Sequence, residues 1–468
     1  MIYALLRAIA GVALRWFYRG LDIEGLERVP RTGPVLLVVN HPNALVDALL
    51  VSWIVPRRIM LTAKATLFKN PIAAWLLARC GVVPLVRVSD VRSGELPGTL
   101  DPGRNTQSFQ ALHGVLERGG AVLIFPEGKS HDEPAMAPLR TGAARIALQA
   151  RDEIGIRQLA IVPIGLTFER KEKPRTRVLI QVGEPIALDS WRAPSAGGAA
   201  AQALTEEIDT RLRAVTLNYA TADDASRSTA LASLLTALFT EAPSVGASGP
   251  PLRTQVSIAR RIDRARLQLA ACPDPELRER SDELLRRLTA FEQALAHRGV
   301  QMEDLEIPIA LPDGARFLAR EGWIFAVAGP VALWGNLNHW LPFHLARALA
   351  MRSVESAADP AMRTIVAGAV FVLGFYAAQG ALVAALAGRL VAALYLASLP
   401  IAADVNFVWG ERLERATRRA RTYLLFRRDP GLQSRFINEL RWLRAEALAV
   451  DALLPEPQVV SVAAVDGG

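Results

Sequence analysis

Residues 35–47 read VLLVVNHPNALVD. The first five are valines and leucines, which favours a short buried strand. Pro42 and Asn43 then form a turn, and the apolar run of residues 44–53 opens a helix. The stretch therefore predicts a strand that passes directly into a helix, with His41 and Asp47 at the junction.

Strand and helix signals continue to alternate up to about residue 190. An α/β domain, a mixed sheet surrounded by helices, is therefore predicted over residues 21–218, with a helical region after it that carries a membrane hairpin. We expect further strands at 82–88, 121–125, 159–168 and 177–182, and helices at 108–117, 140–152 and 190–218.

The composition limits the classes of function. Hydrophobic residues make up 51% of the 468 residues, and the mean hydropathy of +0.21 is high for a soluble protein. The net charge of +8 suits anionic lipid headgroups, acidic substrates or nucleic acid. Because no known nucleic-acid-binding motif accompanies the charge and many arginines flank apolar stretches, no nucleic-acid partner is expected.

The two cysteines, Cys80 and Cys272, lie far apart, and neither belongs to a Cys-x-x-Cys pair. No metal-ligand spacing occurs in the sequence. We therefore predict no disulfide framework and no metal site, and we expect a reducing compartment.

The C-terminal half is predicted to be helical and membrane-associated. A linker at 219–251 precedes a charged helical hairpin at 252–316, for which the sequence suggests no function, and a membrane region follows at 317–410. Within that region, 364–388 and 390–409 are each long enough to cross a hydrocarbon layer of ~30 Å as a transmembrane hairpin. A buried core of soluble helices is the alternative interpretation.

Segment 322–345 is also uncharged, but prolines, asparagines and histidines interrupt it. Arginines follow both this segment and the hairpin, and arginine-rich flanks prefer the cytoplasmic side. Both flanks lie on that side only if 322–345 does not cross, so we predict a re-entrant or interfacial segment. Residues 411–468 are then an arginine-rich cytoplasmic helix and a tail.

Residues 1–20 are predicted to form an amphipathic helix. On a helix, Arg7, Arg15 and Arg19 share one arc, and apolar residues occupy the rest of the surface. This pattern fits a helix that lies in the membrane surface, and it fits a helix packed on its own domain equally well.

His41 and Asp47 are the candidate catalytic pair. Histidine ordinarily titrates near neutral pH, so it can take a proton from an alcohol that attacks a carbonyl carbon. A carboxylate on the other ring nitrogen fixes the tautomer and stabilises the imidazolium. No serine or cysteine nucleophile is needed, and no Gly-x-Ser-x-Gly motif occurs. A single pair of this spacing is weak evidence, so its weight depends on the surrounding motifs.

Those motifs follow one another in a specific order. After residues 40–47 come KATLFKNP at 64–71 with GVVPLVR at 81–87, then FPEGKSHD at 125–132, then VPIG at 162–165. In these blocks, over residues 24–187, the chain resembles the glycerophospholipid acyltransferase family with its PlsC-like domain. The resemblance implies transfer of a fatty acyl group from a thioester to a glycerol hydroxyl, with His41 as the base and Asp47 as its partner.

The resemblance also implies binding residues. Arg87 would help to hold the phosphate of the acceptor, for which its fork of donors is suited. Glu127 and Gly128 would shape the acceptor site, with Glu127 bonding a glycerol hydroxyl; a turn carboxylate that caps the next helix is the alternative interpretation of Glu127. Pro163 would lie in the block associated with the acyl donor.

Three basic residues are further candidates for the phosphate, namely Lys64, Lys129 and Arg140, and a solvated surface charge is an equally simple interpretation of each. His131 and Asp132 could form a second polar pair near the site, or they could only stabilise the turn. No cofactor is expected, because acyl-CoA or acyl-ACP (acyl carrier protein) would act as the co-substrate.

The chain departs from the commonest family pattern at two places. Five residues separate His41 from Asp47 where four are usual, and Lys129-Ser130-His131-Asp132 follows the glycine where Thr-Arg-Ser is usual. Both departures resemble the branch that includes fungal-type glycerol-3-phosphate and dihydroxyacetone-phosphate acyltransferases. That branch implies the first acylation of phosphatidic acid biosynthesis. Lysophosphatidate acylation is the alternative, and a non-enzymatic lipid-binding protein on the same fold is a third.

The expected partners follow from these functions. They are membrane lipids, a glycerol phosphate-type acceptor, and acyl-CoA or acyl carrier protein. The expected location is the membrane, specifically a bacterial inner membrane, with the catalytic domain on the cytoplasmic side.

Overall fold

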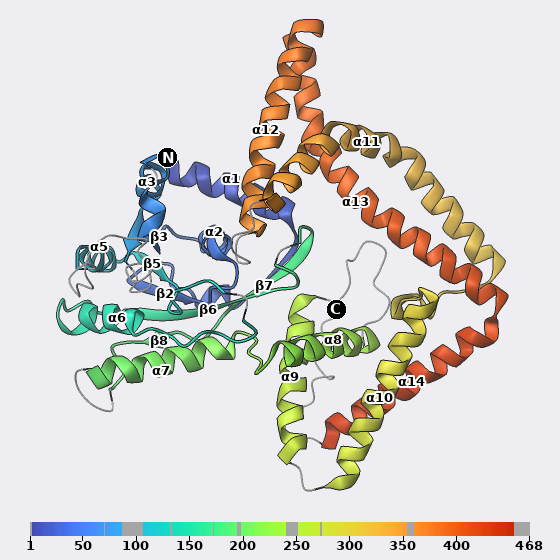
Figure 1. Ribbon diagram of the computed structural model, residues 1–468, viewed down its shortest axis with the longest axis horizontal. Coiled ribbons are helices and arrows are strands. Elements are labelled where there is room, and N and C mark those ends of the chain that lie inside the picture. The colour runs from blue at the N-terminus through green and yellow to red at the C-terminus, as the bar shows by residue number, and fades with distance from the viewer. Residues whose placement is uncertain are drawn as a thin grey trace. The chain divides into compact units, whose positions relative to one another are not determined.

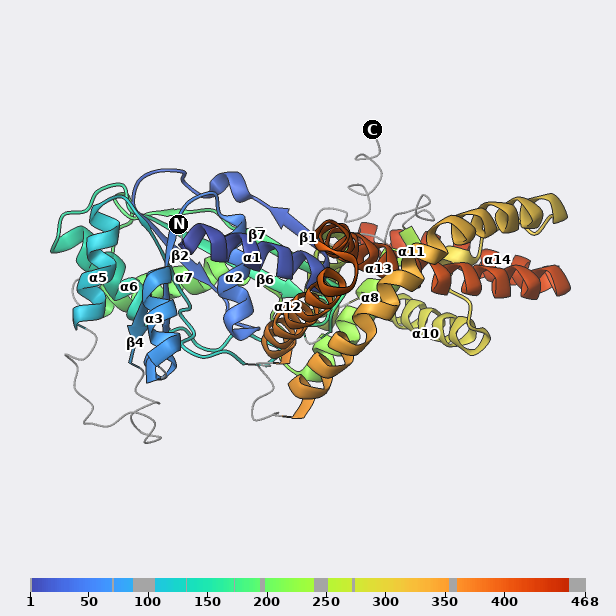
Figure 2. The ribbon, with the colours of Figure 1, turned by 90° about the horizontal axis from the view of Figure 1, so that it is seen from above.

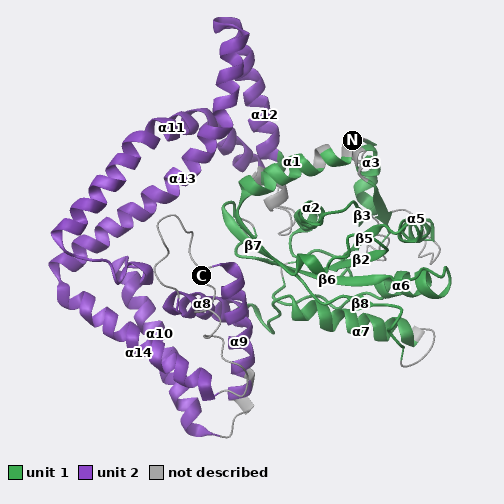
Figure 3. Cartoon of the chain, turned by 180° about the vertical axis from the view of Figure 1, so that it is seen from behind, with its two compact units in different colours: residues 1–222, 350–366 green, residues 223–349, 367–468 purple. Residues whose placement is uncertain are grey.

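The computed structural model divides the chain into two compact units (Figure 3). The first comprises residues 1–222 and 350–366 and contains the sheet; the second comprises residues 223–349 and 367–468 and is helical in its described part. The structure describes residues 2–69, 71–86, 106–131, 133–171, 173–193, 198–239, 251–271, 274–352 and 360–453.

A single mixed sheet forms the centre of the first unit. Its strands pair in the order β1-β7-β6-β2-β5-β3-β4, and β8 pairs with β6. Neighbours are parallel except where β6 meets β7 and β8. The strands are β1 (Tyr18–Glu24), β2 (Val35–Val39), β3 (Ile59–Lys64), β4 (Val82–Leu85), β5 (Ala121–Ile124), β6 (Ala160–Phe168), β7 (Thr176–Val182) and β8 (Ile186–Ala187).

Helices cover both faces of this sheet (Figure 1, Figure 2). One face carries α1 (Ile2–Phe17) and α2 (Ala44–Ile54), and the other carries α5 (Thr106–Glu117), α6 (Gly142–Asp152) and α7 (Gly198–Ala214). The described part of the unit also contains the helix α3 (Pro71–Cys80) and the short 3-10 helices η1 (Leu26–Arg28) and η2 (Ala65–Lys69).

β2 shows why its residues are apolar at every position. Leu36 and Val38 point into the core beneath α5, α6 and α7, whereas Val35, Leu37 and Val39 point into the core beneath α1 and α2. Both faces of a central parallel strand are buried, so an uninterrupted apolar run is needed rather than an alternating one. The predicted α/β fold with a mixed sheet is confirmed, and β2 lies where it was expected.

The structure contains three strands that the sequence did not predict, β1, β3 and β8. β1 has the mixed sequence YRGLDIE and lies at the edge of the sheet, where one side of the backbone needs no partner. The expected strand at 82–88 ends at Leu85, and residues 87 and 88 lie outside the described residues.

The N-terminal helix is shorter than predicted, because Tyr18 begins β1. Its arginines contact the domain: Arg7 donates to the carbonyls of Trp53 (3.0 Å) and Val55 (2.9 Å) at the end of α2, and the Arg15 guanidinium lies 5.2 Å from the Trp53 ring centroid. Cations at a helix C-terminus satisfy its last carbonyls. One face of α1 is therefore packed on the domain, and its use of a membrane surface stays a prediction.

The second unit consists of long helices in its described part. They are α8 (Ala222–Phe239), α9 (Leu252–Ala271), α10 (Pro275–Arg298), α11 (Leu311–Arg352), α12 (Pro360–Ala387), α13 (Arg389–Arg428) and α14 (Pro430–Leu453), with a 3-10 turn η4 (Met302–Asp304). α8 corrects the prediction of a linker over 219–251, because it places Leu238 in a helical core with α10 and α14. Residues 240–250 of that linker lie outside the described residues.

α10 packs along α14 rather than serving only as one arm of the predicted hairpin at 252–316. Two ion pairs join these helices, Arg280 to Glu446 (2.8 Å) and Arg287 to Glu439 (2.6 Å). The order of the partners shows that the helices run antiparallel. The same core joins the helices before and after the apolar region into one unit.

Among the described residues, two helices are long and apolar enough to cross a membrane by length and composition, Thr364–Ala387 and Arg389–Arg428. They are joined at Gly388, whose φ of +89° lies in the left-handed region. Segment 322–345 belongs to α11, which stays helical through Pro330 and Pro342. The re-entrant or interfacial position of that segment stays a prediction. The tail beyond residue 453 lies outside the described residues.

Candidate active site

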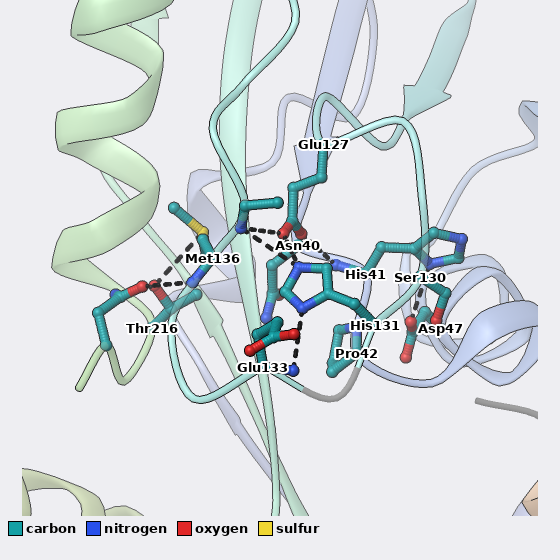
Figure 4. Close-up of polar contacts among 12 residues, drawn as sticks. Asn40, His41, Pro42, Asp47, Glu127, Ser130, His131, Glu133, Met136 and Thr216 are labelled. Carbon is teal, nitrogen blue, oxygen red and sulfur yellow. Dashed lines mark hydrogen bonds and ion pairs between the residues drawn. The ribbon is translucent and has the colours of Figure 1, made fainter. Parts of the chain in front are cut away.

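His41 stands where the chain leaves the sheet and enters α2. Its Nδ1 lies 3.0 Å from Oδ2 of Asp47, which occupies the first turn of α2 (Figure 4). Oδ2 also accepts the backbone N–H of Asn43 at 2.8 Å, so Asp47 closes the turn as well as contacting the ring. The structure thus brings together the two residues that the sequence proposed as a pair.

Asp47 is completely buried, at 0% exposure. Burial raises the pKa of its carboxyl group above the ordinary value, while the hydrogen bonds from His41 and Asn43 and the charge of Lys171 act in the opposite direction. A poorly hydrated carboxylate gains a large stabilisation from a positive charge on the adjacent ring. The Asp47 carboxylate therefore lies where it can stabilise an imidazolium that forms while a proton is transferred.

The contact with Asp47 also decides which ring nitrogen is the base. An ionised carboxylate only accepts hydrogen bonds, so Nδ1 of neutral His41 carries the proton and Nε2 holds the lone pair. Within the part of the chain that the structure describes, no hydrogen-bond partner occupies Nε2. The ring stacks on Phe125 with centroids 3.8 Å apart, so Nε2 is held in one direction and is available to a ligand.

Asn40 fixes the point at which the chain leaves the sheet. Its side-chain amide accepts the N–H of Leu166 (2.7 Å) and donates to the Leu166 carbonyl (3.1 Å) in β6. These two bonds replace the backbone pairing that would otherwise continue beyond Val39 and Ile164. The backbone of His41 is therefore released from the sheet while its position is still set by β6.

Glu127 brings the second motif to the pair. It follows β5 in a turn closed by the Gly128 N–H and the Phe125 carbonyl (3.1 Å), and Gly128 has a φ of +72°, which favours glycine. The Glu127 carboxylate accepts the backbone N–H of His41 at 2.8 Å. Two motifs distant in sequence thus meet through one buried side chain.

Arg140 and Lys64 both lie near the Glu127 turn, Arg140 through a backbone hydrogen bond and Lys64 through the pairing of β3 with β5. The N–H of Arg140 donates to the Pro126 carbonyl at 2.8 Å, and its side chain is exposed. Lys64 ends β3, whose parallel neighbour β5 leads into the turn, so it lies at the same carboxyl edge of the sheet. Both positions suit contact with an anionic acceptor.

The other predicted binding residues lie in different environments. Lys129 is exposed directly after the Glu127 turn. Pro163 is buried in β6 opposite Val38, so it belongs to the sheet below His41. Arg87 lies outside the described residues. The roles of these residues in binding stay predictions.

Lys171, which lies after β6, was not predicted from the sequence as a residue of the site. Its Nζ donates to the carbonyl of Pro42 at 2.8 Å and lies 3.4 Å from the carbonyl of His131. No motif surrounds Lys171, so no local pattern indicated it. Ser130 belongs to the motif at 125–132 but was not itself predicted to have a role, and its Oγ accepts the N–H of Ala44 at 3.0 Å.

The comparisons with known proteins concern this same region. A family model described as acyltransferase matches residues 20–167, which contain His41, Asp47 and Glu127. Glycerol-3-phosphate O-acyltransferase 2 of Saccharomyces cerevisiae is 41% identical over 85 residues, which are 18% of this chain and 11% of that protein. The 1-acyl-sn-glycerol-3-phosphate acyltransferase of Cocos nucifera is 26% identical over 192 residues, which are 39% of this chain and 55% of that protein.

The chain thus spans less than two thirds of either relative. Among solved structures, the 1-acyl-sn-glycerophosphate (LPA) acyltransferase PlsC from Thermotoga maritima is similar at 18% identity and a TM-score of 0.33. The alignment covers 46% of this chain and 78% of that one.

Proposed function

We propose, on the basis that residues 20–167 match a family model described as acyltransferase, that the protein acylates glycerol 3-phosphate or dihydroxyacetone phosphate in phosphatidic acid biosynthesis. The observation that carries this proposal is the buried Asp47 at 3.0 Å from Nδ1 of His41, with Nε2 open to a ligand. A base of this kind serves direct transfer to an alcohol, and no enzyme nucleophile is required.

The mechanism follows from the geometry. Nε2 of His41 takes the proton of the acceptor hydroxyl while the oxygen attacks the thioester carbonyl carbon, and Asp47 stabilises the imidazolium. The C–S bond then breaks, the thiolate leaves and takes the proton from Nε2, and an ester remains on the acceptor. Atoms and protons balance without a covalent acyl-enzyme.

The choice of acceptor rests on the two departures from the commonest family pattern. The branch that carries them acts on unacylated acceptors, and the similarity to a yeast glycerol-3-phosphate O-acyltransferase supports this choice. The longer similarity to a coconut 1-acyl-sn-glycerol-3-phosphate acyltransferase supports lysophosphatidate instead. Both acceptors present a phosphate and a free hydroxyl, and Arg87, Lys64, Lys129 and Arg140 are the residues proposed to bind that phosphate.

The donor is acyl-CoA or acyl-ACP, and the protein works at a membrane. Two apolar helices support membrane association, and the exposed apolar side chains of α1, Ile9 and Val12, add to it. We propose that the catalytic unit lies on the cytoplasmic side of a bacterial inner membrane, and the arginines that follow the hairpin support the cytoplasmic side by the positive-inside rule.

The test is acyl transfer by membranes that contain the protein. Labelled acyl-CoA and acyl-ACP are offered with glycerol 3-phosphate, dihydroxyacetone phosphate or lysophosphatidate. We expect transfer to an unacylated acceptor, and we expect His41→Ala to lower the rate by at least about a hundredfold, the usual share of a general base, with unchanged membrane association. A preference for lysophosphatidate would overturn the acceptor, and activity of His41→Ala within a few-fold of wild type would overturn the role of His41.

A further inference from the structure

Glu127 was expected to bond a hydroxyl of the acceptor, but its surroundings point elsewhere. The side chain is 1% exposed, and protein donors occupy both carboxylate oxygens. Oε1 accepts the N–H of His41 at 2.8 Å, and Oε2 accepts the N–H of Ala137 at 2.8 Å. A carboxylate that is buried and bonded in this way presents no surface to a substrate hydroxyl.

His131 adds a third donor to Glu127 (Figure 4). Its Nδ1 accepts the N–H of Glu133 at 3.2 Å, and on this contact we assign the ring proton to Nε2. Nε2 lies 2.5 Å from Oε2 of Glu127 and donates to it. The Ala137 N–H also lies 3.2 Å from Nε2, but its shorter contact is with Glu127.

Glu127 contacts the backbone of the turn at residues 41–44. In this turn, each residue has a backbone N–H or carbonyl that is hydrogen-bonded to a side chain. Glu127 binds the N–H of His41, Lys171 binds the carbonyl of Pro42, Asp47 binds the N–H of Asn43, and Ser130 binds the N–H of Ala44. Ala44 itself has a φ of +44°, a strained value for a residue other than glycine. Side chains from outside the turn thus hold it in a conformation that it would not keep alone.

We infer that Glu127 is a positioning residue that acts through the backbone of His41, and that His131 orients Glu127 for this purpose. The two departures from the usual motifs, the longer spacing from His41 to Asp47 and the residues that follow Gly128, are then parts of the same arrangement. The longer turn between His41 and Asp47 has one more residue to fix, and the segment 130–131 supplies the side chains that fix it directly or through Glu127. This inference rests on the proposed acyl transfer for its kinetic test, but not for its chemical test.

The kinetic test separates positioning from substrate binding. It uses the full chain in membranes and the acceptor that the wild type acylates fastest. We expect His131→Ala to lower kcat about tenfold and to change the acceptor KM less than twofold, because loss of orientation affects the reacting geometry. His131→Gln, whose amide N–H reaches a similar position, should restore at least half of the lost rate. Glu133→Ala keeps the backbone N–H that His131 uses and should match the wild type within twofold.

In Glu127→Gln, an NH2 group replaces one carboxylate oxygen. In either orientation of the amide this NH2 group faces a protein N–H that also donates, because protein N–H groups approach both oxygens of Glu127. We expect a fall in kcat at least as large as that of His131→Ala, and no further fall in the double variant Glu127→Gln/His131→Ala. An acceptor KM raised several-fold at unchanged kcat in Glu127→Gln, with His131→Ala like the wild type, would overturn the inference in favour of substrate binding.

The chemical test needs no acceptor. Diethyl pyrocarbonate modifies accessible imidazoles, and peptide mass spectrometry locates the modified histidine. We expect His41 to react at least threefold faster in His131→Ala than in the wild type or in Glu133→Ala, because the turn is released. Equal rates would overturn the inference even if acyl transfer is observed, and faster modification without any acyl transfer would support it while the proposed function fails.

Discussion

Asp47 illustrates the conflict between stability and activity at a single residue. Its carboxylate is buried, and Oδ1 has no hydrogen-bond partner in the described structure. Asn at this position would keep an acceptor for the contacts of Oδ2 and remove the buried charge. The charge stabilises an imidazolium during transfer, so its removal should slow the reaction. The same removal should raise the stability of the folded protein, because a buried charge is lost.

We predict that Asp47→Asn lowers kcat/KM about a hundredfold or more and raises the thermal unfolding midpoint of the detergent-solubilised protein, by about 2–4 °C for each kcal/mol gained. Differential scanning fluorimetry and the transfer assay measure the two effects. A fall in both stability and activity would show that the ionised carboxylate stabilises the fold, contrary to its burial.

The same residue predicts a pH dependence. Because burial raises the pKa of Asp47 above its ordinary value of 3.8, the unfolded chain releases this proton at a lower pH than the native protein does. The wild type therefore loses stability as the pH rises from that value to the raised native pKa. The advantage of Asp47→Asn should be small at pH 4 and should grow toward neutral pH, whereas a constant difference would contradict the raised pKa.

At the scale of elements, the turn after β5 depends on one glycine. Gly128 has a φ of +72°, and a Cβ added there would meet Arg140 Cγ only at 3.6 Å, so backbone strain rather than collision sets the cost. We predict that Gly128→Ala lowers the free energy of unfolding by about 1–2 kcal/mol and lowers kcat by moving Glu127. Urea unfolding and the transfer assay measure these effects.

Gly142→Ala is the matched control for that substitution. Gly142 begins α6, an added Cβ there meets no atom within 4 Å, and its φ is not in the positive range. Alanine is favoured over glycine in a helix by up to about 1 kcal/mol, so this variant should be as stable as the wild type or more so. Equal behaviour of the two variants would show that the turn does not need its left-handed residue.

The elements also show what a sequence can and cannot predict. β2 was predicted because five consecutive valines and leucines are typical of a strand buried on both faces, whereas β1, with charged and glycine residues, gave no such pattern. Arg7 and Arg15 were correctly placed on one arc of a helix, but periodicity does not say which arc is packed, and both contact the end of α2. α8 was not predicted, because its alanine- and serine-rich sequence resembles a linker.

The same distinction applies to the candidate site. His41, Asp47 and Glu127 were proposed from the sequence because each carries chemistry within a short motif. Lys171 was not, because its contact with Pro42 arises only when β6 and β2 pair in the sheet. The motif suggested a substrate contact for Glu127, and only its burial and its three donors reveal a different use.

For the whole molecule, the distinguishing feature is the apolar hairpin formed by α12 and α13. Its arms are mostly exposed to the surroundings, and Leu386 and Leu390 beside the Gly388 turn are 78% and 76% exposed. Exposed apolar surface of this extent is costly in water and favourable in lipid. We therefore predict that the protein remains in the membrane fraction after washing with alkaline carbonate, and that release into the supernatant would exclude a spanning hairpin.

The orientation of that hairpin can be tested with single cysteines in a Cys80→Ala/Cys272→Ala background. If both arms cross the membrane and the catalytic unit is cytoplasmic, Leu390→Cys at the turn faces the outside, and Arg421→Cys on the arginine-rich part of α13 faces the cytoplasm. A membrane-impermeant maleimide should then label Leu390→Cys in intact spheroplasts and Arg421→Cys only after permeabilisation. Labelling of both only after permeabilisation would mean that the hairpin does not reach the far side, and labelling in the reverse order would place the His41 site outside, away from the cytosolic acyl donors on which its proposed reaction depends.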